Sequence, residues 1–275
     1  MQEQVCKNCG NHFIGRFCNN CGEKVYHDKD KVVLHLFDEA FHFITHFEGT
    51  FFTSLKTILK KPGKLSVDFC NGIRKKYFKP LSFFLMLVIL YLLFPLFEGL
   101  NMKLHYHQYN DLYGAYAAKK AAAVMQQKGM TWDQLSEAFH HSGEKVSKFL
   151  LFTIIPCMAL FSWLMGSKKR KYYYDHFIFS TEVGSFFLLW GFLIFPALLY
   201  GSRLVFGSFL LDKESYLAIV IFAAMMIFLT VGAIRFFKFK IWYSIIYSIL
   251  YMGILMLFLN YVYKFVLFYL AINQV

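Results

Sequence analysis

The chain has 275 residues, of which 57% are hydrophobic and 20% aromatic, and this composition is too apolar for a soluble globular protein. The formal net charge of +12 would suit a nucleic-acid-binding protein, but the basic residues cluster beside apolar runs and form no basic face of their own. Composition and charge therefore indicate an integral membrane protein and argue against nucleic acid as a partner.

Cys6, Cys9, Cys18 and Cys21 form a C-x2-C-x8-C-x2-C pattern in which a glycine follows each pair. Glycine lets each C-x-x-C-G half curl around one ion and turn its amides toward the sulfur atoms. Four thiolates make a closed tetrahedral site, which typically holds structural zinc. A rubredoxin-like iron centre and a redox dithiol pair remain alternatives. Because so short a segment cannot bury a core, we expect the metal to provide most of its folding free energy.

The remaining two cysteines, Cys70 and Cys157, are expected to be small buried hydrophobic residues. The clustered thiols and the polar N-terminus, which does not resemble a signal peptide, indicate the reducing cytosol.

An amphipathic helix is expected over residues 32–47, after a charged linker. Asp38, His42 and His46 are spaced four residues apart on its polar side, which would allow a second metal site. A solvated polar face explains the same residues. The H-F-I-T-H sequence lacks the glutamate of H-E-x-x-H, which argues against a metalloprotease.

A second short helix is expected over residues 50–59, where Pro62 and Gly63 follow as helix breakers. Its lysines suit a membrane interface with anionic headgroups, although packing on the membrane-embedded body explains it equally well. A basic element over residues 74–79 precedes the first apolar run, and four of its side chains are predicted to contact lipid headgroups: Arg74, Lys75, Lys76 and Lys79.

Five apolar runs have about the length that a helix needs to cross a bilayer. They cover residues 81–97, 149–166, 177–200, 216–234 and 241–263. We therefore expect an all-α polytopic membrane protein with about five transmembrane helices and a small N-terminal zinc ribbon. Pro95, Pro156 and Pro196 are expected to kink their helices.

Basic clusters at residues 74–79, 168–171 and 235–240 all lie on one side of the membrane if the five spans alternate. That side is predicted to be the cytoplasm, which places the N-terminus inside and the C-terminus outside. The expected domains are the zinc ribbon at 1–26, cytoplasmic or interfacial amphipathic helices at 27–79, and a transmembrane domain at 80–275.

The long external loop, residues 101–148, is expected to form a helical hairpin. Gly129 would end its first helix, and Thr131 with Gln134 would form a capping box at the start of the second. Four histidines of this loop are further possible metal ligands: His105, His107, His140 and His141. The hairpin would cover the bundle or offer a docking surface to a partner.

Four pieces of the sequence resemble an uncharacterised bacterial membrane family: the cysteine cassette at residues 6–22, the aromatic-rich helix after it, and the sequences TSLKTILKKPG and GIRKKYFKPLSFF. That family has a CxxCG…CxxCG ribbon, a G-[KR]-R-x-x-Y-x-x-P element and several spans. The matching positions are Gly72, Arg74, Tyr77 and Pro80, while Ile73 departs from the usual basic residue. The resemblance covers about the first 85 residues and implies a bacterial cytoplasmic (inner) membrane location. It implies no activity, substrate or catalytic residue.

Glu182 is the one acidic residue of the third run and a candidate functional residue inside the membrane, or else a partner of the basic residues at 168–171. No G-x-S-x-G, P-loop or Rossmann glycine pattern is present. We therefore expect a non-catalytic adaptor or accessory subunit, with lipids and other subunits or a second copy as partners. A transporter or channel that uses Glu182 is the alternative. A lipid-modifying enzyme follows, in which Arg74, Lys75 and Lys76 would hold a lipid phosphate and His42 or His46 would act as acid and base.

Overall fold

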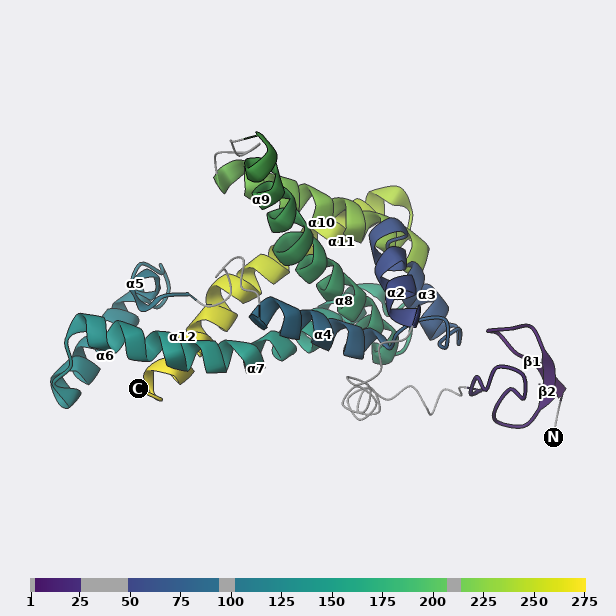
Figure 1. Cartoon of the computed structure of the whole chain (residues 1–275), viewed down its shortest axis with the longest axis horizontal. Coiled ribbons are helices and arrows are strands. Elements are labelled where there is room, and N and C mark those ends of the chain that lie inside the picture. The colour runs from purple at the N-terminus through teal and green to yellow at the C-terminus, as the bar shows by residue number, and fades with distance from the viewer. Residues whose placement is uncertain (1–2, 26–48, 94–101, 207–213) are drawn as a thin grey trace. The chain divides into compact units, whose positions relative to one another are not determined.

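The computed structural model describes residues 3–25, 49–93, 102–206 and 214–275 (Figure 1). The expected helix with Asp38, His42 and His46 lies outside these residues, as does Pro95. The described elements are β1 (Glu3–Val5), β2 (His12–Ile14), α2 (Gly49–Lys60), α3 (Lys64–Cys70), α4 (Pro80–Leu93), α5 (Leu104–His107), α6 (Gly114–Lys128), α7 (Trp132–Gly166), α8 (Tyr173–Phe187), η2 (Leu188–Ile194), α9 (Phe195–Phe206), α10 (Glu214–Phe237), α11 (Ile241–Leu257), η3 (Phe258–Tyr263) and α12 (Lys264–Ile272).

Within the described residues, four helical stretches are long and apolar enough to cross a membrane: Phe149–Gly166, Tyr173–Gly201, Ile219–Phe237 and Ile241–Ile272. They correspond to four of the five expected spans and confirm a polytopic all-α membrane protein. The first expected span begins at Pro80 as α4, whose 14 described residues are fewer than the about 20 required. The rest of its apolar run lies outside the described residues.

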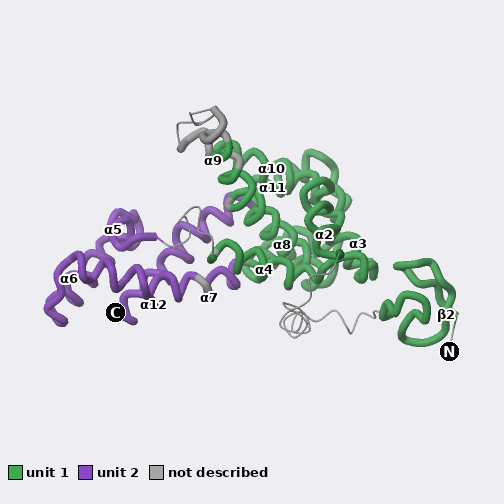
Figure 2. The backbone as a smooth tube through the Cα atoms, viewed as in Figure 1, with its two compact units in different colours: residues 1–96, 155–251 green, residues 97–154, 252–275 purple. Residues whose placement is uncertain are grey.

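The chain forms two compact units (Figure 2). The first contains residues 1–96 and 155–251, so it holds the cysteine cassette, α2 and α3 together with most of the apolar helices. The second contains residues 97–154 and 252–275. Two of the three boundaries fall inside α7 and α11, so each of these helices contributes residues to both units.

In the first unit, α4 packs on α8, and the short helix α3 packs on both α8 and α10. Phe179 of α8 stacks on Phe236 of α10 with ring centroids 4.9 Å apart. Gly63 lies so close to Gly232 that a Cβ atom on Gly63 would be 2.8 Å from the Gly232 carbonyl oxygen. Two glycines thus allow the turn before α3 to touch the backbone of α10.

The helix that begins as α8 widens into the π-helix η2 before it continues as α9. Pro196 lies just after η2 and has no N–H to donate to the preceding turn. A local widening is one way to accommodate such a proline. The irregularity expected at Pro196 therefore takes the form of a π-helical segment.

The second unit is built from α5, α6, the first part of α7 and α12 around a core that includes Leu135, Phe139 and Phe268. The expected hairpin is present: Gly129 caps α6 with a φ of 63°. The Thr131 amide donates to Gln134 Oε1 over 3.0 Å, and the Gln134 amide donates to Thr131 Oγ1 over 3.4 Å.

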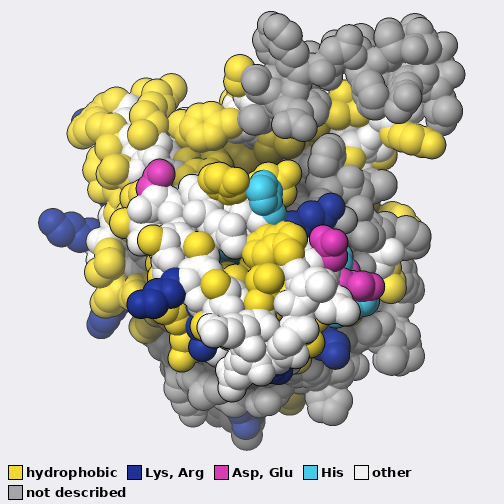
Figure 3. All heavy atoms as spheres, turned by 90° about the vertical axis from the view of Figure 1, so that its left-hand side faces the viewer, with side chains coloured by type: hydrophobic (Ala, Val, Ile, Leu, Met, Phe, Trp, Pro, Cys, Tyr) yellow, Lys and Arg dark blue, Asp and Glu magenta, His cyan; other side chains and the backbone are white. Residues whose placement is uncertain are grey.

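The second helix of the hairpin does not end before the membrane but continues as α7 for 35 residues. At 1.5 Å per residue α7 is about 52 Å long, which exceeds the about 30 Å of a hydrocarbon core. The face of the molecule that carries α5 and α6 presents charged and histidine side chains among hydrophobic ones (Figure 3). The second unit thus contains the polar N-terminal part of a helix whose apolar C-terminal part, Phe149–Gly166, is long enough to cross a membrane.

Candidate metal centre and the anchored segment beside it

The cysteine cassette contains two hairpins with the same hydrogen-bond pattern. In the first, the Cys6 amide donates to the Asn11 carbonyl and the Gly10 amide to the Cys6 carbonyl, both over 2.8 Å. In the second, the Cys18 amide donates to the Glu23 carbonyl over 2.8 Å, and the Gly22 amide donates to the Cys18 carbonyl over 2.7 Å. Strands β1 and β2 pair antiparallel on either side of the first hairpin. Gly10 and Gly22 have positive φ angles of 76° and 67°, as expected for the C-x-x-C-G pattern.

The four sulfur atoms converge on one point. All lie within 4.8 Å of one another, with 3.5 Å between Cys6 and Cys21 and 3.6 Å between Cys9 and Cys18. Four thiolates at about 2.3 Å from a tetrahedral zinc ion would be roughly 3.8 Å apart. The donor set therefore fits one metal ion held by four thiolates. Buried Phe13 packs against Cys6 and Cys18 and fixes one side of the site.

Backbone amides favour the thiolate form at both Cys6 and Cys18, but their balance with burial differs between the two cysteines. Burial raises the pKa of Cys18, but amide hydrogen bonds from Cys21 and Asn20 outweigh this effect and lower it to about 6. Burial dominates at Cys6 and raises its pKa to about 11. A bound cation would replace these protons, so metal affinity must decrease as the pH decreases.

The metal-binding cassette is attached to the helical body through Lys75. The Lys75 amide donates to the carboxylate of Glu23 over 2.9 Å, and its ammonium group donates to the Cys21 carbonyl. Glu23 is buried although it is acidic. Lys75, predicted to contact headgroups, thus binds the last cysteine of the cassette and Glu23, two residues after it.

The other basic residues of this element differ in their surroundings. Arg74 is buried, donates from Nε to the Phe69 carbonyl over 3.1 Å, and lies over the rings of Phe69 and Tyr174. It therefore closes the C-terminal end of α3 and is part of the protein interior. Lys76 is exposed and lies over the ring of Tyr77, while Lys79 is partly buried. Headgroup contact by Lys75, Lys76 and Lys79 stays a prediction.

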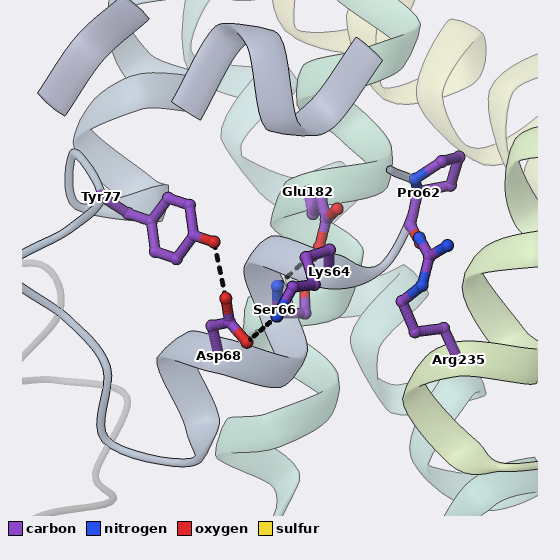
Figure 4. A network of polar contacts seen from close by, with 7 residues as sticks. All are labelled: Pro62, Lys64, Ser66, Asp68, Tyr77, Glu182 and Arg235. Carbon is purple, nitrogen blue, oxygen red and sulfur yellow. Dashed lines mark hydrogen bonds and ion pairs between the residues drawn. The ribbon is translucent and has the colours of Figure 1, made fainter. Parts of the chain in front are cut away.

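Glu182 does not pair with the basic residues at 168–171; its carboxylate binds the N-terminal end of α3 (Figure 4). It accepts hydrogen bonds from the amides of Gly63 over 2.9 Å and Ser66 over 2.8 Å, and from the Ser66 hydroxyl. Arg235 of α10 donates to the carbonyl of Pro62, and its charge acts on Glu182. The interface pairing was wrong because the free amides of a helix start are nearer and attract a carboxylate.

A second buried carboxylate, Asp68, holds the other end of α3. Its two oxygens accept hydrogen bonds of 2.6 Å from Lys64 and from the Tyr77 hydroxyl (Figure 4). Burial and this carboxylate together raise the pKa of Tyr77 well above its usual range, so the phenol stays protonated and donates. The segment from Pro62 to Tyr77 is therefore bound by carboxylates at both ends of α3.

The four positions of the G-x-R-x-x-Y-x-x-P element each have a structural role here. Gly72 adopts a φ of 97°, Arg74 binds the end of α3, Tyr77 binds Asp68, and Pro80 is the first residue of α4. The last position suits proline because the first turn of a helix leaves its N–H groups unpaired.

A model of the family described as "Protein of unknown function (DUF3667)" matches residues 48–92, which cover α2, α3 and nearly all of α4. This agrees with the expected resemblance to an uncharacterised family, while the cysteine cassette and the four long helices lie outside the matched residues. No curated protein and no solved structure matches the chain.

Other expected sites gain less support. In the described part of the chain, the four cysteines are the one group of potential ligands close enough to hold a metal. His107 is buried and lies 2.8 Å from the Tyr113 hydroxyl, and His140 lies 3.5 Å from Glu144. Cys70 is buried as expected, but Cys157 is exposed, because hydrocarbon can cover an apolar side chain that faces out of a membrane helix.

Sequence reasoning missed Glu23, Asp68 and Arg235 as positioning residues. Only Asp68 carried a local signal, since Lys64 precedes it by four residues on the same helix. The partners of Glu23 and Arg235 are more than 50 and 170 residues away in sequence, respectively, as the separations of 52 and 173 show.

Proposed function

We propose that this chain is a non-catalytic adaptor or accessory subunit of a membrane protein complex, with its metal-binding cassette in the cytoplasm. One observation carries the proposal: the cassette is attached to the membrane body and also has exposed hydrophobic side chains. Lys75 provides the attachment. Ile14 and Phe17 are 63% and 60% exposed and belong to the same small cassette, so they offer an apolar surface to a partner.

Zinc is the metal that we assign to this cassette. Four thiolates leave no open coordination position, which suits a structural ion and not a catalytic one. We expect one equivalent of zinc in the purified protein by metal analysis. Iron in that amount, or no metal, would contradict the assignment.

The role of Glu182 weakens the alternative of a transporter. Its carboxylate accepts three hydrogen bonds from the α3 region, so positioning α3 accounts for its burial. The lipid-modifying alternative used His42 or His46, which lie outside the described residues, and Arg74, Lys75 and Lys76. Arg74 is buried against Phe69 and Lys75 binds the cassette, so this alternative gains no support from them.

The adaptor proposal is tested by isolation of the tagged chain from native membranes in mild detergent at native abundance. We expect other subunits to co-elute in a fixed ratio, and the double variant Ile14→Ser/Phe17→Ser to lose them while it retains its metal. Elution of the chain alone, or in company with nothing but a second copy, would count against the proposal.

Phe52→Ser is the matched control, because Phe52 on α2 is 65% exposed but belongs to no part of the cassette. This variant should keep the co-eluting subunits. If it loses them to the same degree, the cassette is not the docking surface.

A further inference from the structure

The first unit contains an apolar groove that the proposed function does not use. It has a volume of about 390 Å³, and its lining includes Leu59 at the end of α2, Phe186, Trp190 and Ile194 of α8 and η2, and Ala224 and Ile227 of α10. This volume lies within the range of about 300–1,000 Å³ that is typical of ligand sites. Most of the lining belongs to two of the stretches that are apolar and long enough to cross a membrane, Tyr173–Gly201 and Ile219–Phe237, so an apolar occupant suits the groove.

We propose that the groove binds an acyl chain of an anionic phospholipid, whose headgroup is held by Lys60 and Lys61. These two lysines are exposed and lie between Leu59 and Pro62, both of which line the groove. The positive charge is therefore placed where the groove meets the end of α2. A phosphate in that position would be attracted by both ammonium groups.

The lining favours a lipid chain over a helix of another subunit. Helices that associate in membranes usually meet at small residues, which let the two backbones approach closely. In this groove large side chains such as Phe186, Trp190 and Ile227 dominate, and Ala224 is the small exception. A flexible acyl chain can follow the spaces between such side chains, whereas a helix cannot.

Trp190 adds a polar group to the apolar lining. It belongs to the π-helix η2, and its indole N–H is buried without a hydrogen-bond partner among the described residues. A buried donor of this kind carries a cost in free energy unless an acceptor is supplied. Because this N–H is buried, an occupant of the groove would contact the indole ring and not the donor, which makes Trp190 a reporter of the occupant.

The end of the groove near the lysines is fixed before any lipid binds. Arg235 holds the Pro62 carbonyl, and Glu182 holds the amide of Gly63. Because these contacts already order the turn, a lipid does not have to provide the free energy for ordering it. The backbone directly after Lys60 and Lys61 is thereby held beside the groove that Pro62 lines.

The test uses full-length protein in lipid bilayers, with Trp132, Trp163 and Trp242 replaced by Phe so that Trp190 is the remaining fluorophore. Phosphatidylglycerol or phosphatidylcholine brominated on the acyl chains is titrated in, since bromine quenches a tryptophan that it contacts. We expect brominated phosphatidylglycerol to quench Trp190 at the lower mole fraction. At about a fivefold change per lysine, Lys60→Gln/Lys61→Gln should reduce this preference roughly thirtyfold.

Two further variants make the result specific. Ala224→Phe should fill the groove and reduce quenching by both lipids, whereas Lys119→Gln/Lys120→Gln on α6 should change nothing. Equal quenching by the two lipids in the parent protein, or full quenching in Ala224→Phe, would overturn the proposal. Absence of quenching in protein that retains a co-purified subunit would overturn it in favour of a protein occupant.

Discussion

Glu182 is a buried carboxylate with a clear structural task. Both of its oxygens accept hydrogen bonds from the start of α3, and the positive charge of Arg235 lies nearby. A carboxylate inside a membrane protein is costly unless such partners are present. Its three donors explain how this charge is tolerated, and they connect the family-matched residues to α8.

Replacement of Glu182 should therefore destabilise the first unit. Glu182→Ala leaves the amides of Gly63 and Ser66 buried without an acceptor, and we expect a loss of about 3 kcal/mol. Glu182→Gln keeps one oxygen but turns an N–H group toward a donor, so its loss should be smaller. Thermal unfolding in detergent measures both effects. Glu137→Ala, at an exposed position of α7, is the control, and equal stability of Glu182→Ala and the control would contradict the anchoring role.

His107 makes the second unit sensitive to acid. Burial among aromatic rings, together with the charge of Lys264, lowers its pKa from 6.5 to about 4. In the unfolded chain this histidine binds a proton at about pH 6.5, whereas in the folded chain it does so only near pH 4. The unfolded state therefore binds more protons between these values, and stability must decrease as the pH falls from about 6.5 to about 4.

We expect the second unit to lose on the order of 3 kcal/mol of stability between about pH 6.5 and about pH 4. Hydrogen exchange of this unit across the same pH range measures the loss. His107→Phe should remove most of the pH dependence, since phenylalanine fills the same apolar site without titrating. His105→Phe, at an exposed position two residues away, should leave it unchanged. If His107→Phe remained as acid-sensitive as the parent, another group would be responsible.

At the scale of elements, the turn before α3 depends on the contact of Gly63 with Gly232. Gly63 and Gly129 both have positive φ angles, 74° and 63°, so an alanine is strained at either position. At Gly129 nothing lies within 4 Å of the added methyl group, and the strain alone should cost about 1–2 kcal/mol. At Gly63 the methyl group also meets the carbonyl of Gly232, so Gly63→Ala should cost clearly more.

Chemical or thermal unfolding of the two alanine variants measures the difference between them. If Gly63→Ala and Gly129→Ala lowered the free energy of unfolding equally, α3 and α10 could separate without cost. The close approach of Gly63 to Gly232 would then contribute nothing to stability. A larger loss in Gly129→Ala than in Gly63→Ala would reverse the argument.

Elements with local signals were predictable from the sequence. Pro80 begins α4, Gly129 ends α6, and Thr131 with Gln134 caps the start of α7, because each signal acts within one helical turn. The four cysteines were predictable for the same reason, since each C-x-x-C pair supplies two of the four potential metal ligands within four residues.

Contacts between distant elements were not predictable in this way. Glu182 binds residues 116 and 119 positions earlier, and nothing in its local sequence identifies them. The continuation of α7 from its polar into its apolar part was also missed, because Gly143 and the change in composition suggest two segments, whereas one helix runs through both. Hydrophobic pattern gives the spans but not the partners of the few polar side chains between them.

At the scale of the molecule, the metal centre is connected to the membrane helices by a short series of contacts. Glu23 and the Cys21 carbonyl bind Lys75, Arg74 closes α3, and Glu182 fixes the start of α3 on α8. A small cassette of this kind has little structure without its ion, since metal binding supplies about 10–16 kcal/mol in comparable domains. Metal binding should therefore determine whether the cassette can hold Lys75 in the loop after α3.

Removal of the metal by a chelator should free this loop while the helices remain. Hydrogen exchange should show full exchange of residues 6–22 and increased exchange at the amide of Lys75, which loses its Glu23 acceptor. The Ser66 amide should stay protected because Glu182 does not depend on the ion. A Cys9→Ser/Cys18→Ser variant should behave like the chelated protein, and Cys157→Ser like the parent. Unchanged protection of Lys75 after the metal has left would mean that the cassette docks as a preformed domain, and the coupling between ion and membrane helices would then be rejected.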